Sequence, residues 1–97
     1  MTSGETVRAE ILISGRVQGV GFRRFARNTA ERLGVKSNPI NLRDGRVFVI
    51  AEGRPEAVEL YINELRKGPM FAHVEDVDVT LKEALGNVYD QAFRKKA

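Results

Sequence analysis

Residues 15–23 contain the pattern in this sequence that is best suited to chemistry. They read Gly-Arg-Val-Gln-Gly-Val-Gly-Phe-Arg, so three glycines fall within seven residues, between a strand-like run and a helix-like run. A backbone that turns sharply at such a junction exposes a row of N–H groups, and a concave row of this kind binds anions, phosphate above all. The pattern therefore predicts a phosphate site whose donors are the backbone N–H groups of Gln18, Gly19, Val20, Gly21 and Phe22.

Arg23 is the side chain best suited to complete this site. It falls in the first turn of the expected helix, where the helix dipole disfavours a cation unless an anion joins it. Its guanidinium can hold a phosphoryl group through charge-assisted, bidentate hydrogen bonds. The alternative is an ordinary solvated surface arginine, since Arg24 and Arg27 are close by in the sequence. The local pattern leaves both interpretations open.

Asn41 is a second candidate, on a different segment. It precedes an Asp44-Gly45 turn, and its amide can donate and accept hydrogen bonds at once, which suits the orientation of a water molecule. From the local sequence alone, a turn former is the more ordinary interpretation of Asn41. Asn38 is a rival amide on the same segment.

The remaining chemical side chains are expected at the surface. His73 is the single histidine, and we expect it to be a surface residue rather than a catalytic one. Asp76 and Asp78 alternate with valines and predict the solvated face of a strand, because a metal site needs more convergent oxygen ligands. No metal site is therefore expected.

The elements that would position these residues follow from hydrophobic periodicity and from glycine and proline signals. The expected order is a strand at Val7–Ser14, a helix at Phe22–Leu33, strands at Val35–Leu42 and Arg46–Ala51, a helix from Pro55 to Gly68, a strand at Val74–Leu81 and a short strand or tail at Tyr89–Arg94. The first strand is half-buried, with Arg8, Glu10 and Ser14 on its polar face. Pro39 cannot donate to a ladder, so its strand is expected at a sheet edge.

This order predicts an α+β fold, the ferredoxin-like βαββαβ plait. Its antiparallel sheet has the order 4-1-3-2 with two helices on one face, because a right-handed crossover puts the first and third strands side by side. We expect one domain, residues 1–97, in which residues 1–6 are a disordered N-terminal tail.

Composition and charge narrow the function classes. The net charge is +3 and the pI about 9.6, but the charges are interspersed, so ordinary surface charge is favoured over nucleic-acid binding. The mild positive bias also suits a small anionic substrate. The absence of cysteine excludes disulfides, thiolate chemistry and Cys-based zinc sites. The sequence contains no signal-peptide pattern and no run of roughly 18 apolar residues, so we expect a cytoplasmic protein without membrane contact.

Residues 15–23 resemble the signature loop of the acylphosphatase family. The family's second signature, an Asn before an Asp-Gly turn and a strand, is similar to residues 33–53, where Asn41 precedes the turn. Residues 67–77 also resemble the family, so the similarity covers about residues 7–81. One departure falls beside Asn41: residues 37–40 read Ser-Asn-Pro-Ile, where the family usually has Gly, an aromatic and a small apolar residue.

The resemblance implies a function. Acylphosphatases hydrolyse the carboxyl–phosphate bond of acyl phosphates without a metal or an organic cofactor. By resemblance, Arg23 holds the phosphate together with the loop amides of residues 18–22, and Asn41 orients the attacking water. We expect a monomer whose partner is a small acyl phosphate, with no nucleic acid.

Two other functions stay open at this point. A plait of this kind can be a non-enzymatic RNA- or phosphate-binding module, and RNA binding needs exposed aromatic residues on the open sheet face. Leu12 and Phe48 are the large candidates there. An acylphosphatase-like domain can also be an accessory part of a larger carbamoyl-phosphate-handling protein, such as the hydrogenase maturation carbamoyltransferase.

Overall fold

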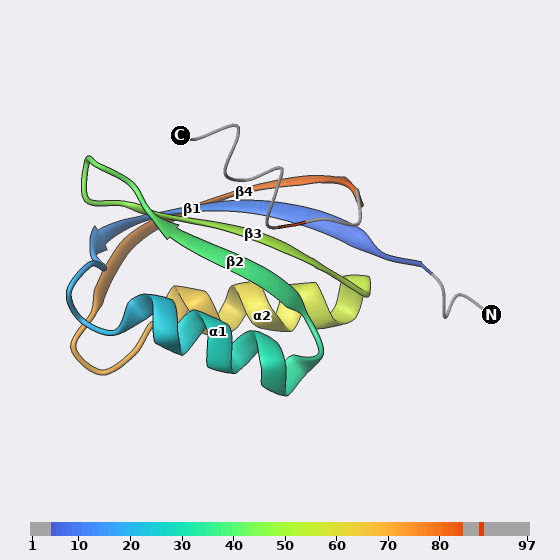
Figure 1. Ribbon diagram of the computed structural model, residues 1–97, viewed down its shortest axis with the longest axis horizontal. Helices are drawn as coiled ribbons and strands as arrows, with labels where there is room; N and C mark the ends of the chain where they lie inside the picture. The colour runs from blue at the N-terminus through green and yellow to red at the C-terminus, as the bar shows by residue number, and fades with distance from the viewer. Residues whose placement is uncertain (1–4, 85–87, 89–97) are drawn as a thin grey trace.

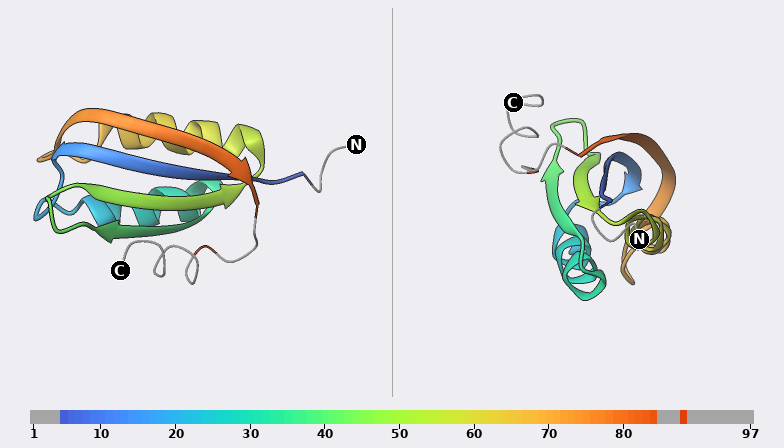
Figure 2. Two further views of the ribbon diagram at one scale, coloured as in Figure 1. Left: turned by 90° about the horizontal axis from the view of Figure 1, so that it is seen from above. Right: turned by 90° about the vertical axis from the view of Figure 1, so that its right-hand side faces the viewer.

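The structure is a computed structural model that describes residues 5–84 and Val88. Its elements follow in the order β1 (Val7–Arg16), α1 (Phe22–Leu33), β2 (Lys36–Asn41), β3 (Val47–Gly53), α2 (Pro55–Lys67) and β4 (His73–Glu83) (Figure 1). The strands form one antiparallel sheet in the order β2-β3-β1-β4, and both helices lie on the same face of it (Figure 2). The predicted plait with the order 4-1-3-2 is confirmed, and the strand that contains Pro39 lies at an edge as predicted.

Two expectations fall on parts of the chain that the structure does not describe. The short strand or tail at Tyr89–Arg94 lies wholly outside the described residues, and so do residues 1–4 of the expected N-terminal tail. Glu5 and Thr6 are exposed and precede β1. Neither helix of the described part is long and apolar enough to cross a membrane.

The core lies between the sheet and the two helices. Alternate residues of β1 and β3 point into this layer and are fully buried: Ala9, Ile11, Ile13, Val47, Val49 and Ala51. They pack on the buried faces of α1 and α2, including Phe22 and Tyr61. Burial of one large apolar side chain contributes about 1.5–3 kcal/mol. The layer as a whole therefore fixes α1 on the sheet, and with it the loop that precedes α1.

The outer face of β1 differs from the sequence expectation. Arg8 falls on the polar side of the strand as predicted, but it is buried, with 0% of its surface exposed. Its Nη1 donates a hydrogen bond of 3.0 Å to Oε2 of Glu52, and its Nε lies 3.5 Å from Oε2 of Glu10. The reason lies in the ladder, because β3 places Glu52 directly opposite Arg8. Glu10 on the same strand and Glu52 on β3, which is distant in sequence, thus provide the anions that allow Arg8 to be buried.

A second, smaller apolar cluster also covers part of the outer face. It consists of Phe48, Ile50 and Val88, with Leu12, Ile40 and Leu42 packed against it. Phe48 is only 4% exposed. Its ring is therefore not available for stacking on a nucleotide base, which is what an RNA-binding sheet of this fold requires.

Candidate active site

The loop between β1 and α1 leaves the first turn of α1 open to a ligand. Gly21 is the N-cap of α1 and has φ 80° and ψ 19°, a left-handed conformation that glycine adopts without strain. No side chain caps this end, and no acidic residue lies in the first turn, which instead carries Arg23 and Arg24. The N–H groups of a first turn have no partners within the helix. This end of α1 thus presents donors and positive charge to an anion.

Gly15 has a different role from the other glycines of the motif. The ladder between β1 and β4 shifts register between Ser14 and Gly15, and Gly15 pairs with Val74. A Cβ atom at Gly15 would collide with the backbone carbonyl oxygen of His73. Gly15 therefore allows the close approach of β4, whereas the sequence pattern alone assigned all three glycines to one anion-binding loop.

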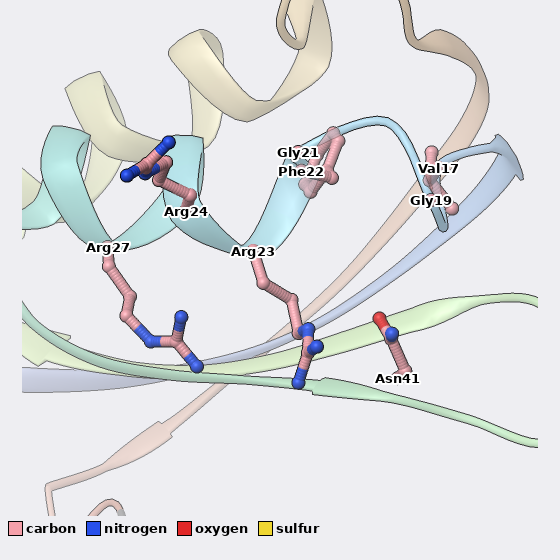
Figure 3. Close-up of a pocket in the computed structure, with 8 residues that line it drawn as sticks. All are labelled: Val17, Gly19, Gly21, Phe22, Arg23, Arg24, Arg27 and Asn41. Atoms are coloured by element: carbon pink, nitrogen blue, oxygen red, sulfur yellow. The ribbon is translucent and has the colours of Figure 1, made fainter.

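One pocket brings the two predicted site residues together. It has a volume of about 240 Å³ and is lined by Val17, Gly19, Gly21, Phe22, Arg23, Arg24, Arg27 and Asn41. Arg23 comes from the first turn of α1 and Asn41 from the end of β2, and both side chains project into the space between these elements (Figure 3). Of the five predicted loop donors, Gly19, Gly21 and Phe22 line the pocket. Val20 packs instead against the core.

Strand alternation distinguishes Asn41 from its rival, Asn38. In the ladder between β2 and β3, Asn41 stands opposite Val47, whose side chain faces the helices, and Asn38 stands opposite Ile50, whose side chain belongs to the outer cluster. Successive side chains of a strand point to opposite faces. Asn41 therefore faces the α1 side, and the amide of Asn38 donates on the other side to the carbonyl oxygen of Val88, at 3.5 Å.

The side chain of Gln18 ties the loop to the hairpin that carries Asn41. Its Nε2 donates hydrogen bonds to the carbonyl oxygens of Leu42, at 2.7 Å, and Arg46, at 2.9 Å. These carbonyls flank the turn between β2 and β3. The sequence pattern identified only the backbone N–H of Gln18 as functional. The contact of its side chain was missed because it joins residues far apart in sequence.

The acidic residue nearest in sequence to Asn41 is engaged within the turn itself. Oδ1 of Asp44 accepts a hydrogen bond from the backbone N–H of Arg46 at 3.1 Å, and Oδ2 accepts one from Nε of Arg46 at 2.8 Å. The hydrogen bond from the Arg46 side chain holds the pKa of Asp44 below its usual range. Asp44 is thus an ionised turn residue, and its proton affinity is too low for a good general base.

Three arginines give the pocket its charge. Among the residues that the structure describes, Arg23, Arg24 and Arg27 line it and no carboxylate does. Arg23 and Arg27 extend from α1 toward β2, whereas Arg24 points to the opposite side of the helix (Figure 3). The sequence analysis treated Arg27 only as a neighbour of Arg23. Their spacing of four residues, which places two side chains on one helix face, was the signal that it left unused.

The described residues offer no alternative centre for metal chemistry. Over residues 5–84 and at position 88, no three His, Asp or Glu side chains gather closely enough to hold a metal ion. His73 is exposed, as predicted, and pairs through its backbone with Arg16 at the end of β1. The polar groups that line the described part of the pocket are three arginines, backbone N–H groups and the amide of Asn41.

Known proteins resemble this chain in sequence and in fold. A sequence model of the family described as Acylphosphatase matches residues 9–94. An acylphosphatase from Thermus thermophilus is 49% identical over 79 residues, which cover 81% of this chain and 90% of that protein. The crystal structure of acylphosphatase from Bacillus subtilis has a TM-score of 0.81 at 34% identity, over 84% of this chain and 91% of that one. Full-length HypF, in its phosphate- and nucleotide-bound form, has a TM-score of 0.76 at 29% identity, over 84% of this chain but only 11% of that one.

Proposed function

The chain belongs to the acylphosphatase family and is a hydrolase of acyl phosphates, and we propose that hydrolysis takes place in the pocket between α1 and the end of β2. The substrate is a small acyl phosphate, and the products are its carboxylate and inorganic phosphate. One observation carries the proposal: Arg23, with no carboxylate partner in the described part of the chain, shares a pocket with Asn41.

In the first step, the phosphoryl group binds at the start of α1. The guanidinium of Arg23 and the backbone N–H groups of residues 18–22 donate to its oxygens. Hydrogen bonds between ionised partners are stronger than those between neutral ones, and here the helix dipole adds to them. The same donors stabilise the charge that develops on the phosphoryl oxygens in the transition state.

In the second step, water attacks phosphorus. The side chain of Asn41 accepts a hydrogen bond from this water and holds it in line with the bond to be broken, which is a positioning role. The water oxygen bonds to phosphorus, and the bond from phosphorus to the acyl oxygen breaks with its electron pair. The proton of the water passes to a phosphoryl oxygen, because Asp44 is engaged with Arg46 and no carboxylate or histidine is in the described lining of the pocket. The carboxylate is a good leaving group, so no general acid is needed.

Phosphate release from benzoyl phosphate in the presence of a metal chelator tests the proposal. We expect wild-type protein to be active, and Arg23→Ala and Asn41→Ala to fold normally but lose at least about a hundredfold in kcat/KM, as when one oxyanion donor is removed. Asn38→Ala is the matched control, because the Asn38 amide donates to the carbonyl oxygen of Val88 on the opposite face of β2, and the variant retains activity. Loss of wild-type activity in chelator, or near-normal kcat for Asn41→Ala, would contradict the mechanism.

A further inference from the structure

We propose that Arg27 determines substrate specificity by binding a carboxylate on the acyl part of the substrate. The preferred substrates are then acyl phosphates whose acyl group carries a second, free carboxylate, rather than acyl phosphates with a neutral acyl group. The inference rests on the proposed function and names the substrate class of that same site.

Arg27 lies where the phosphate pocket meets a second pocket. The second pocket has a volume of about 320 Å³ and is lined by Arg27, Ala30, Glu31, Val35, Lys36, Ser37 and Asn38. Arg27 is the residue that lines both spaces. Because α1 runs away from the loop and β2 runs back toward it, the two pockets follow one another along the groove between these elements. The groove leads from Asn41 past Arg23 to Arg27 and then to Lys36.

The in-line geometry of phosphoryl transfer directs the acyl group along this groove. The attacking and leaving oxygens lie on opposite sides of phosphorus. With the water at Asn41 and the phosphoryl group at Arg23, the leaving group extends away from Asn41. In Figure 3 the guanidinium of Arg23 lies between Asn41 and the guanidinium of Arg27. The acyl group is therefore directed toward Arg27.

The charge and reach of Arg27 match a second anionic group. Its side chain is exposed and projects toward β2 on the same side of α1 as Arg23 (Figure 3). Four residues advance a helix by about 6 Å, which is the scale of a small acyl group. A guanidinium matches a carboxylate in a planar, bidentate geometry. Glu31 also lines the second pocket, and its negative charge disfavours an anion beside it.

Two substrates of the same shape and different charge test the proposal. These are 3-carboxybenzoyl phosphate and its neutral isostere, 3-carbamoylbenzoyl phosphate, each hydrolysed by wild type and by Arg27→Gln. We expect wild type to prefer the carboxylated substrate and Arg27→Gln to lose about tenfold in kcat/KM on it, the effect of one charge-assisted hydrogen bond. On the neutral substrate the variant loses less, because only the general attraction of a pocket cation for the phosphoryl group is reduced. Added salt reduces the wild-type preference, because the arginine is exposed.

Arg32→Gln is the matched control. It removes the same charge from the last turn of α1, where Arg32 lies 4.0 Å from Glu64 and lines neither pocket, and it leaves the preference unchanged. An equal loss on both substrates in Arg27→Gln would assign Arg27 to the phosphoryl group or to the leaving carboxylate and would overturn the inference. An unchanged preference would overturn it as well. If wild type hydrolysed neither substrate, the proposed function itself would fail, which is a separate result.

Discussion

Arg8 and Arg23 are two arginines of one small domain in opposite circumstances. Arg8 lies on the outer face of β1, is fully buried, and meets the carboxylates of Glu52 and Glu10. Arg23 lies at the start of α1, is exposed, and faces a pocket that no carboxylate of the described chain lines. The fold supplies anions to the first arginine, whereas the second one remains available to an anionic ligand.

The difference separates structure from function in this chain. A buried guanidinium without counter-ions would cost several kcal/mol, so Arg8 is tolerated only because the ladder brings carboxylates to it. An exposed guanidinium in the first turn of a helix is only slightly unfavourable, and a bound anion reverses the effect. The presence or absence of protein partners therefore separates the arginine that stabilises the fold from the arginine that we propose binds substrate.

The largest expected effect is the loss of stability on substitution of the buried arginine, Arg8. Arg8→Gln removes the cation that bonds Glu52 and Glu10 in a poorly solvated place, although Glu10 keeps its ion pair with Lys82, at 3.1 Å. Breaking a buried pair in this way costs about 3–5 kcal/mol of unfolding free energy. We expect the lower part of that range, because Nη2 of Arg8 is itself buried and has no hydrogen-bond partner among the described residues. Urea unfolding measures the loss.

Arg23→Gln is the matched variant for this measurement, because it makes the same chemical change at the exposed arginine. We expect its unfolding free energy to be unchanged or slightly higher, since it removes a cation from the first turn of α1. Equal losses of stability in the two variants would contradict the comparison. So would an Arg8→Gln protein as stable as wild type.

The two arginines also show which features of this protein can be predicted from the sequence and which cannot. Arg23 became a candidate from local rules, because glycines, a helix start and a cation are adjacent in the chain. The strand order followed from the βαββαβ sequence and from Pro39 at the edge. The burial of Arg8 was not predictable in this way. It depends on Glu52, which reaches Arg8 only through the register of β1 on β3.

The second expected effect concerns Tyr61, another polar group that the fold satisfies by itself. Its hydroxyl donates a 3.0 Å hydrogen bond to the carbonyl oxygen of Ala26, and burial raises the pKa of Tyr61 to about 12. An unfolded tyrosine ionises near pH 10. The raised pKa thus contributes stability that is fully present below pH 10 and is lost as the pH rises toward 12, by nearly 3 kcal/mol in total, or about 1.4 kcal/mol per pH unit.

Unfolding free energies of wild type and Tyr61→Phe across pH 9–12 measure this contribution. At neutral pH we expect Tyr61→Phe to be about 1 kcal/mol less stable, the value of one hydrogen bond. Above pH 10 the difference shrinks and then reverses, because phenylalanine has no proton to lose. Parallel curves for the two proteins over the whole range would show that Tyr61 does not titrate with folding.

A third, smaller effect is expected at Gln18, which connects the two halves of the pocket. Gln18→Ala removes the hydrogen bonds to the carbonyl oxygens of Leu42 and Arg46, so the loop is no longer tied to the hairpin that carries Asn41. Each bond contributes about 1 kcal/mol, and a loosened site loses positioning. We expect kcat on benzoyl phosphate to fall about tenfold with little change in KM. A rise in KM at constant kcat would mean that Gln18 acts in binding only.

The site was less predictable than the fold because, like the burial of Arg8, it depends on contacts between residues that are distant in sequence. Asn41 and Asn38 stand three residues apart and look alike in sequence, and only their places on β2 set them on opposite faces. The side-chain bonds of Gln18 join segments more than twenty residues apart. Arg27 was also missed, although its four-residue spacing from Arg23 could have been read from the sequence. Relations within one helix are predictable in this way, whereas contacts across the ladder or between the loop and the hairpin are not.

The smallest expected effect is at Glu31, which lines the second pocket. If Arg27 binds the acyl carboxylate, Glu31 repels it weakly across solvent, by about 0.5 kcal/mol at a separation of roughly 8 Å. Glu31→Gln then raises kcat/KM for 3-carboxybenzoyl phosphate about twofold at low salt, and leaves the carbamoyl substrate unchanged. Glu75→Gln, the same change at an exposed position on β4, leaves kcat/KM for both substrates unchanged.

A twofold gain in Glu31→Gln that survived in 0.5 M salt would not be electrostatic, since a Debye length of a few ångströms screens this distance. The groove would then select substrates by shape, and the open arginines would serve the phosphoryl group alone.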